Sequence, residues 1–148
     1  MATKSTENIA RRTKLFLIED DQNIREAFTL CLESEGYEVE SFSNGKEALT
    51  RLHVAPEPCL ILLDLMMPIM NGMEFMLEFT KFPATVIPVP VYLCSATSNK
   101  AESKRMGCTG FIKKPVDLEV LLKIVRDCCP TNSETAATVK KAGFAREP

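Results

Sequence analysis

Short apolar runs and amphipathic segments alternate along most of the chain. Residues 15–18 are all apolar and end abruptly at the acidic residues 19–21. Residues 59–63 are apolar at every position and end at Asp64. A strand that has no polar face is covered on both sides, which is typical of a central strand in a parallel sheet. Residues 59–63 are therefore predicted to form such a central strand.

Three further segments have the character of strands. Residues 37–41 alternate between apolar and polar positions, residues 91–94 follow Pro90, and residues 109–113 form a last short run. A proline inside a strand would remove a hydrogen bond of the ladder, but a proline at the start of a strand is tolerated. The pattern therefore predicts five strands in all.

Apolar residues recur at helical spacing between and after these strands. Asp21 is expected to cap the first helix and Gly36 to end it, whereas Pro115 precedes the last helix. Residues 98–106 also look helical, but Ala101 is nearly their only apolar anchor, so this helix is expected to be thinly anchored. The predicted inward-facing residues of the other helices are Ile24, Ala27, Phe28, Cys31, Leu32, Ala48, Leu49, Leu52, Phe75, Met76, Phe79, Leu118, Leu121, Leu122 and Val125.

Five strands that are each followed by a helix predict an α/β fold with a doubly wound sheet and right-handed crossovers. In such sheets, ligands bind outside the carboxyl ends of the strands, where the strand order reverses. The polar residues expected at those ends are residues 19–21, Asp64, Ser95, Lys113 and Lys114. The predicted site therefore combines several carboxylates with one hydroxyl and an amine.

Composition and charge define the body of the protein. The chain has 148 residues, of which 45% are hydrophobic, and this is enough for one domain with a sizeable core. The net charge of −2 argues against a globally basic nucleic-acid binder and against an acidic disordered chain. Residues 1–14 carry +3 and residues 131–148 carry +1, so the residues between them carry −6. We expect a flexible basic N-terminal segment at 1–14, a globular domain at 15–130 and a flexible tail at 131–148.

The cysteines and the apolar runs indicate the cellular compartment in which the protein is expected. No apolar run is long enough to cross a bilayer, and residues 1–14 lack the apolar core of a signal peptide. The six cysteines lie within apolar segments without a C-x-x-C pair, and the chain has a single histidine. The sequence therefore predicts a cytoplasmic protein whose cysteines are reduced core residues, with no function assigned to Cys128 and Cys129.

The acidic sheet edge suggests a chemistry. Two carboxylates about 4 Å apart repel each other by roughly 4 kcal/mol at an effective dielectric constant near 20. A divalent cation relieves this repulsion, and oxygen ligands without histidine or thiolate select Mg²⁺, or else Mn²⁺. Such a cation beside a carboxylate and a lysine ammonium is equipped for phosphoryl transfer, in which the carboxylate attacks phosphorus in line.

Residues 15–129 resemble the CheY-like receiver domain of two-component response regulators. Four segments carry the resemblance: residues 16–21 (FLIEDD), 62–72 (LLDLMMPIMNG), 93–96 (LCSA) and 107–115 (GCTGFIKKP). The resemblance implies a five-stranded parallel sheet in the order 2-1-3-4-5, with helices on both faces. It also implies a standalone, single-domain form of the receiver, because few residues follow position 130.

The resemblance also implies roles for the metal-binding residues. Asp64 would be the phosphoacceptor, which forms an aspartyl phosphate. Asp20 would bind Mg²⁺ directly, Glu19 would bind it through water, and the backbone carbonyl of Met66 would complete the metal site together with Asp64.

The remaining implied roles concern the phosphoryl group and the switch. Ser95 and Lys114 would contact the phosphoryl oxygens, whereas Lys113 is expected to be solvated. After phosphorylation, Ser95 would move inward and Phe111 would fill the space that it leaves. The resemblance further implies a cis peptide bond between Lys114 and Pro115.

The predicted function is a phosphorylatable switch, and its only catalysis is phosphotransfer to itself and slow autodephosphorylation. The expected phosphodonor is a sensor histidine kinase or a histidine phosphotransfer (Hpt) protein. Output is expected through a downstream protein, without nucleic acid or membrane, from a monomer or a phosphorylation-dependent dimer. The candidate partner face comprises the helix at 98–106, the strand at 109–113 and the last helix, around Lys100, Lys104, Arg105, Glu119 and Lys123.

Three alternatives stay open on the sequence alone. One is a receiver-like scaffold that binds proteins without being phosphorylated. A haloacid-dehalogenase-type phosphatase needs a second acid two residues after the nucleophile, where this chain has Met66. A flavodoxin needs amides and hydroxyls that cradle a phosphate after the first strand, where this chain has the acidic residues 19–21.

Overall fold

The computed structural model describes residues 14–54, 57–82 and 89–130. The predicted flexible ends, residues 1–14 and 131–148, lie outside this part of the chain except for Lys14, which begins the first strand. Among the described residues, none of the helices has the length and apolar character needed to cross a membrane.

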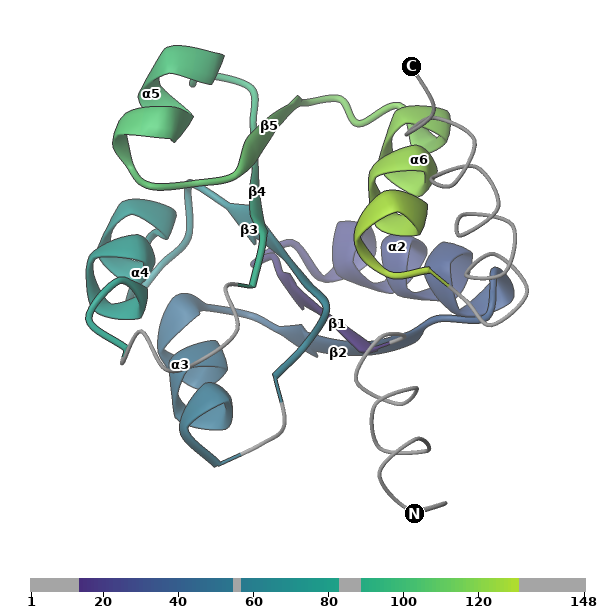
Figure 1. Ribbon diagram of the computed structural model, residues 1–148, viewed down its shortest axis with the longest axis horizontal. Helices are drawn as coiled ribbons and strands as arrows, with labels where there is room; N and C mark the ends of the chain where they lie inside the picture. The colour runs from purple at the N-terminus through teal and green to yellow at the C-terminus, as the bar shows by residue number, and fades with distance from the viewer. Residues whose placement is uncertain (1–13, 55–56, 83–88, 131–148) are drawn as a thin grey trace, which may run out of the picture.

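Five parallel strands form one sheet in the order β2-β1-β3-β4-β5 (Figure 1). This confirms the predicted fold class and strand order. The order reverses after β1, so the carboxyl ends of β1 and β3 lie side by side at the switch point where doubly wound sheets bind ligands. The strands are β1 (Lys14–Ile18), β2 (Glu38–Phe42), β3 (Leu60–Asp64), β4 (Val91–Ser95) and β5 (Gly110–Lys113).

Helices cover both faces of the sheet (Figure 1). Helices α2 and α6 lie on one face, and α3, α4 and α5 lie on the other. Each face has its own hydrophobic core, one built on α2 and α6 and the other on α3 and α4. The helices are α2 (Gln22–Ser34), α3 (Gly45–Val54), α4 (Gly72–Phe79), α5 (Lys100–Arg105) and α6 (Leu118–Cys128).

The central strands supply both cores because successive side chains of a strand point to opposite faces. Leu15 and Leu17 of β1 pack on the side of α2 and α6, whereas Phe16 and Ile18 pack on the side of α3 and α4. All five residues of β3 are buried, as the continuous apolar run predicted. Asp64 therefore stands at the end of a strand that is fixed from both sides.

Most of the predicted helix signals are confirmed. The Asp21 carboxylate accepts hydrogen bonds from the backbone N–H groups of Asn23 and Ile24, which caps α2. Gly36 follows α2 with a φ of 94°, a conformation that favours glycine. Helix α5 is thinly anchored, as expected, but its one buried residue is Ser103, whereas the predicted anchor Ala101 is exposed.

The prediction that Ala27 faces inward is wrong, because Ala27 of α2 is exposed. The prediction that Leu118 faces inward is also wrong. Its side chain is 46% exposed, whereas Leu121 and Val125 of the same helix are buried. Leu118 is the first residue of α6 and directly follows the N-cap residue Asp117, so it precedes the turns that pack on the sheet. Helical spacing identifies the apolar stripe of a helix but does not tell which residues of that stripe contact the core.

The prediction that all cysteines are reduced is wrong for one pair. Cys59, directly before β3, and Cys129, directly after α6, form a disulfide with Cα atoms 5.5 Å apart. The other four cysteines (Cys31, Cys94, Cys108 and Cys128) are free. The partners are 70 residues apart, and only the sheet topology brings them together, so their spacing in the sequence gave no sign of the pairing.

Candidate functional site

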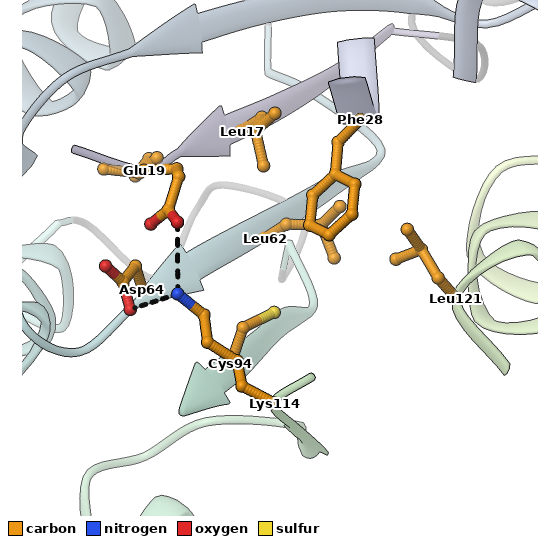
Figure 2. A pocket seen from close by; sticks show the side chains of 9 residues that line it. Leu17, Glu19, Phe28, Leu62, Asp64, Cys94, Lys114 and Leu121 are labelled. Carbon is orange, nitrogen blue, oxygen red and sulfur yellow. Dashed lines mark hydrogen bonds and ion pairs between the residues drawn. The ribbon is translucent and has the colours of Figure 1, made fainter. Parts of the chain in front are cut away.

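The carboxyl ends of β1, β3 and β5 bring the predicted site together. Glu19 directly follows β1, Asp64 is the last residue of β3, and Lys114 directly follows β5. Because parallel strands end at the same edge, three residues that lie far apart in the sequence meet at one place. Figure 2 shows the Lys114 side chain reaching between the two carboxylates.

Lys114 bridges the two acids at hydrogen-bond distance. Its Nζ lies 3.1 Å from Glu19 Oε1 and 3.1 Å from Asp64 Oδ1. The acid side chains are only 4% and 9% exposed, whereas the lysine side chain is 22% exposed. The ammonium therefore donates to two nearly buried carboxylates and keeps one edge toward solvent. Lys113, by contrast, is exposed, as predicted.

The acidic cluster fits a divalent cation. Glu19, Asp20 and Asp64 each offer a carboxylate oxygen, and these atoms all lie within 4.8 Å of one another. Glu19 Oε2 is buried and has no hydrogen-bond partner, which leaves an acceptor in need of a positive group. Oxygen ligands without histidine or thiolate suit Mg²⁺ or Mn²⁺. The three predicted carboxylates therefore come together as a set that such an ion would satisfy.

Burial and mutual repulsion set the protonation of the cluster. Burial and, after it, the nearby Asp64 carboxylate raise the pKa of Glu19 from 4.5 to about 8, against the opposing effect of Lys114. Burial and Asp64 also raise the pKa of Asp20. Burial lowers the pKa of Lys114, but its bonds to Asp64 and Glu19 outweigh that, so this pKa is raised overall. One lysine therefore does not compensate three acids, and a further cation is needed to keep Glu19 ionised at neutral pH.

The cluster closes one end of a small cavity whose other lining residues are mostly apolar (Figure 2). This apolar lining explains why burial is the largest influence on the pKa of Glu19. The apolar lining residues are Leu17, Ile18, Phe28, Leu62, Cys94 and Leu121.

Two residues that support the site were not identified as functional from the sequence. Arg25 of α2 donates from Nη1 to the backbone oxygens of Glu19, at 2.7 Å, and Asp20, at 3.3 Å, which fixes the loop after β1. Gly72 begins α4 so close to β3 that an added Cβ would lie 2.7 Å from the Asp64 carbonyl oxygen. In the sequence, Gly72 was only the last residue of the 62–72 segment, with no role assigned to it, and no pattern singled out Arg25.

Ser95 is placed at the site edge but does not contact the acids. It is buried at the end of β4, and its hydroxyl oxygen accepts hydrogen bonds from the backbone N–H groups of Thr97 and Ser98, both at 3.1 Å. The backbone N–H of Lys114 donates to the Ser95 carbonyl oxygen at 3.1 Å. In this structure the Ser95 hydroxyl is therefore hydrogen-bonded to the loop that follows β4. Its predicted bond to a phosphoryl group stays a prediction.

Three further predictions concern the Lys114–Pro115 peptide bond, Phe111 and Met66. The bond between Lys114 and Pro115 is cis, as expected. Phe111 of β5 is half-buried and packs against the core on the side of α3 and α4. The Met66 side chain is 69% exposed, and the metal-binding role of its carbonyl stays a prediction.

Comparison with known proteins gives a consistent result. The family model of the response regulator receiver domain matches residues 15–126. A transcriptional regulatory protein from Haemophilus influenzae, the CpxR homolog, is 34% identical over 82% of this chain and 54% of its own length. The chain spans about half the length of curated relatives that it matches.

Solved structures show the same fold. The chemotaxis response regulator CheY4 of Vibrio cholerae matches with a TM-score of 0.69 at 30% identity, over 78% of this chain and 98% of CheY4. The receiver domain of the Saccharomyces cerevisiae response regulator Ssk1 was solved with the histidine phosphotransfer signaling protein Ypd1. It matches with a TM-score of 0.69 over 78% of this chain and 88% of that chain, and at 22% identity this likeness concerns the fold alone.

Proposed function

Because the chain belongs to the family of response regulator receiver domains, we propose that it accepts a phosphoryl group on the Asp64 carboxylate in two-component signalling. The observation that carries the proposal is the bridge from Lys114 Nζ to Asp64 and Glu19, 3.1 Å to each. An ammonium held beside the acceptor carboxylate is placed to neutralise charge on an incoming phosphoryl group.

In the proposed transfer, an oxygen of Asp64 attacks phosphorus of a phosphohistidine. The new P–O bond forms as the P–N bond breaks, and the imidazole nitrogen leaves with the electron pair of that bond. Glu19, Asp20 and Asp64 would hold Mg²⁺, which would neutralise developing charge on the phosphoryl oxygens when bound. Lys114 and, after a rotation of its side chain, Ser95 would donate hydrogen bonds to those oxygens.

The proposed phosphodonor is a histidine kinase or a histidine phosphotransfer protein. A hollow of about 580 Å³ beside Lys114 provides an apolar surface on which such a protein can seat a helix. The hollow is open to solvent because Ala27 and Pro115 are exposed. The lining residues are Asn23, Ile24, Ala27, Phe28, Ala96, Lys114, Pro115 and Val116. A donor of this class places the reaction in the cytoplasm, which is the proposed location.

The proposed output is a phosphorylation-dependent change of the partner face. Helix α5 is anchored by Ser103 alone, so a movement of Ser95 and Phe111 can re-position it at small cost. The face presents an excess of basic residues, which favours an acidic downstream protein. The charged residues around which the face was predicted are all exposed: Lys100, Lys104, Arg105, Glu119 and Lys123.

The phosphoryl group is predicted to be lost slowly once it is attached. Met66 and Thr97 flank the acceptor loop and are exposed, but a thioether and a small hydroxyl orient an attacking water poorly. A phosphorylated sample followed by intact mass should keep its phosphoryl group for minutes or longer. A half-life of seconds would contradict this prediction.

Phosphorylation by a small donor tests the proposed function. The chain is incubated with acetyl phosphate and Mg²⁺, and its intact mass is measured. We expect one added phosphoryl group, no addition in EDTA, and no addition in the Asp64→Asn variant. Asp21→Asn is the matched control, because Asn caps a helix as well as Asp and residue 21 lies outside the metal cluster. The absence of an adduct on the unmodified chain would favour the protein-binding scaffold instead.

A further inference from the structure

The disulfide between Cys59 and Cys129 lies outside the phosphorylation site and has no part in its chemistry. Cys59 precedes β3, and its backbone N–H donates to the Lys14 carbonyl oxygen at 2.8 Å, so it is fixed in the sheet. Cys129 follows α6, and its backbone N–H donates to the Val125 carbonyl oxygen at 2.7 Å. The bond therefore ties the last turn of a surface helix to the amino end of a central strand.

We propose that Cys59 and Cys129 form a reversible redox site, in which a small-molecule disulfide closes the bond and a thiol opens it. Closing clamps the C-terminal end of α6 to β3, and opening releases it. The two Cα atoms lie 5.5 Å apart, within the range that a disulfide requires, so neither backbone segment needs to move for the bond to form.

The two sulfurs differ in solvent exposure, so an external thiol or disulfide reacts first with Cys59. Cys129 is fully buried, whereas Cys59 is half-buried. For closing, the Cys59 thiolate attacks the small disulfide and releases one thiolate. The Cys129 thiolate then attacks the Cys59 sulfur of the mixed disulfide and releases the second. Two protein thiols are oxidised and one small disulfide is reduced to two thiols, and the two protons lost by the protein thiols are taken up by the two released thiolates.

Opening reverses these steps, starting with attack of an external thiolate on the Cys59 sulfur.

Three of the four free cysteines, namely Cys94, Cys108 and Cys128, compete poorly for this exchange. Cys94 and Cys108 are buried, and burial raises the pKa of these thiols to about 12 and about 11. Cys128 adjoins Cys129, but burial and the neighbouring Asp127 carboxylate raise the pKa of its thiol. A thiol with a raised pKa supplies little thiolate, which is the attacking species. The pair Cys59 and Cys129 is therefore kept apart from reshuffling with its neighbour.

Opening or closing the disulfide would affect α6 but not the phosphoacceptor Asp64. Cys59 and Asp64 stand at opposite ends of β3, five residues apart, which is roughly 16 Å along a strand. Helix α6 buries Leu121 and Val125 and packs Leu122, Ile124 and Cys128 partly against the same core, and the disulfide adds a covalent link directly after its last turn. Because α6 belongs to the proposed partner face, the redox state would change how firmly that face is held while Asp64 stays able to react.

A redox titration of the full chain tests the inference. The chain is equilibrated under native conditions with reduced and oxidised glutathione at a series of ratios, and the exchange is quenched with acid. It is then unfolded and alkylated, so that buried thiols also react, and mapped by mass. We expect Cys59 and Cys129 to pass together from alkylated to disulfide-linked, and to return when the ratio is reversed. Cys128→Ser should titrate in the same way, whereas Cys59→Ser should leave Cys129 unpaired.

Stability and exchange measurements show whether the bond clamps α6. Closing the bond should raise the melting temperature of the unmodified chain by about 10 °C, and this shift should be absent in Cys59→Ser. Hydrogen exchange of the last turn of α6 should become faster on reduction. Phosphorylation by acetyl phosphate is expected in both redox states, so it reports on the proposed function separately.

Several results would overturn the inference. These are two thiols that never pair at any glutathione ratio, a bond that opens only after the chain unfolds, and pairing of Cys59 with Cys128. Equal melting temperatures for the two redox states would also overturn it. The titration of the unmodified chain gives this answer even if Cys59→Ser fails to fold.

Discussion

Lys114 reaches past the end of β4 to acids at the ends of β3 and β1. Its ammonium is the positive group that the structure places among three carboxylates, and it contacts two of them. Without it, Glu19 and Asp64 would face each other unscreened in a nearly buried place. The lysine therefore both permits the acidic cluster and prepares it for a phosphoryl group.

Replacing this ammonium should slow phosphorylation strongly. In Lys114→Met the chain keeps a side chain of similar length but loses the donor, and we expect the rate of phosphorylation by acetyl phosphate to fall roughly 10²-fold. Lys113→Met is the matched control, because Lys113 is exposed and its loss should leave the rate within about twofold. Equal rates for the two variants would contradict the role given to Lys114.

The raised pKa of Glu19 predicts an unusual dependence of stability on pH. Without metal, the folded chain keeps the Glu19 proton up to pH 8, whereas the unfolded chain loses it near pH 4.5. The stabilisation from this proton is complete below the unfolded pKa and disappears as the pH rises through the folded pKa. In EDTA, the melting temperature should therefore fall between pH 5 and pH 8.

Mg²⁺ should act in the opposite direction, because it binds the ionised carboxylates and competes with the proton. We expect the increase in melting temperature on adding Mg²⁺ to be larger at pH 8 than at pH 5.5. Glu19→Gln should lose both effects, and Glu33→Gln, on the exposed side of α2, should keep them. An increase that is the same at both pH values would show that Glu19 does not take up a proton in the metal-free cluster.

The roles of single residues were predictable where a sequence motif identified them. They were unpredictable where the role depends on contacts that form only in the fold. The ordered motifs predicted that Glu19, Asp20, Asp64 and Lys114 lie together, and the structure brings them to one edge because residues at the ends of parallel strands converge. Arg25 was missed because its role is to hold two backbone carbonyls, and any exposed helix offers similar arginines.

At the scale of elements, period-two and helical patterns located every strand and helix of the described chain, with bounds shifted by a few residues. Continuous apolar runs mark strands that are buried on both faces, so β1 and β3 could be predicted directly from the sequence. What the patterns lacked was the position of each helix along the sheet. Leu118 lies on the apolar stripe of α6 but is exposed, because the helix begins before it meets the core.

The start of α4 carries a prediction of its own, since it crowds the backbone at Asp64. In Gly72→Ala the new Cβ would lie 2.7 Å from the Asp64 carbonyl oxygen, which is main chain and cannot swing away. We expect a loss of roughly 1–3 kcal/mol in the free energy of unfolding and slower phosphorylation by acetyl phosphate.

Gly45→Ala gives the comparison at the start of α3. There the new Cβ would lie 3.1 Å from atoms of the Met70 and Phe75 side chains, and the Met70 side chain is flexible. Its loss of stability should be smaller, and its phosphorylation rate should not change. If both variants behave alike, the close approach of α4 to β3 does not position Asp64.

At the scale of the whole molecule, the strand order came from the resemblance and is the feature on which the site depends. Strand order brings the ends of β1, β3 and β5 to one edge, and the same topology brings Cys59 to Cys129 at the opposite edge. The first convergence was predictable because a known motif accompanies it. The second was not, because two cysteines 70 residues apart carry no spacing signal.

The position of the phosphoryl group on the folded chain tests the central claim most directly. The chain is phosphorylated with acetyl phosphate and Mg²⁺ and then treated with borohydride, which reduces an acyl phosphate to an alcohol and so converts an aspartyl phosphate to homoserine. Peptide mapping by mass should find homoserine at position 64 and an unchanged carboxyl at Glu19, Asp20 and Asp21. Homoserine at another acid, or a borohydride-resistant phosphate on Ser95, would contradict the account.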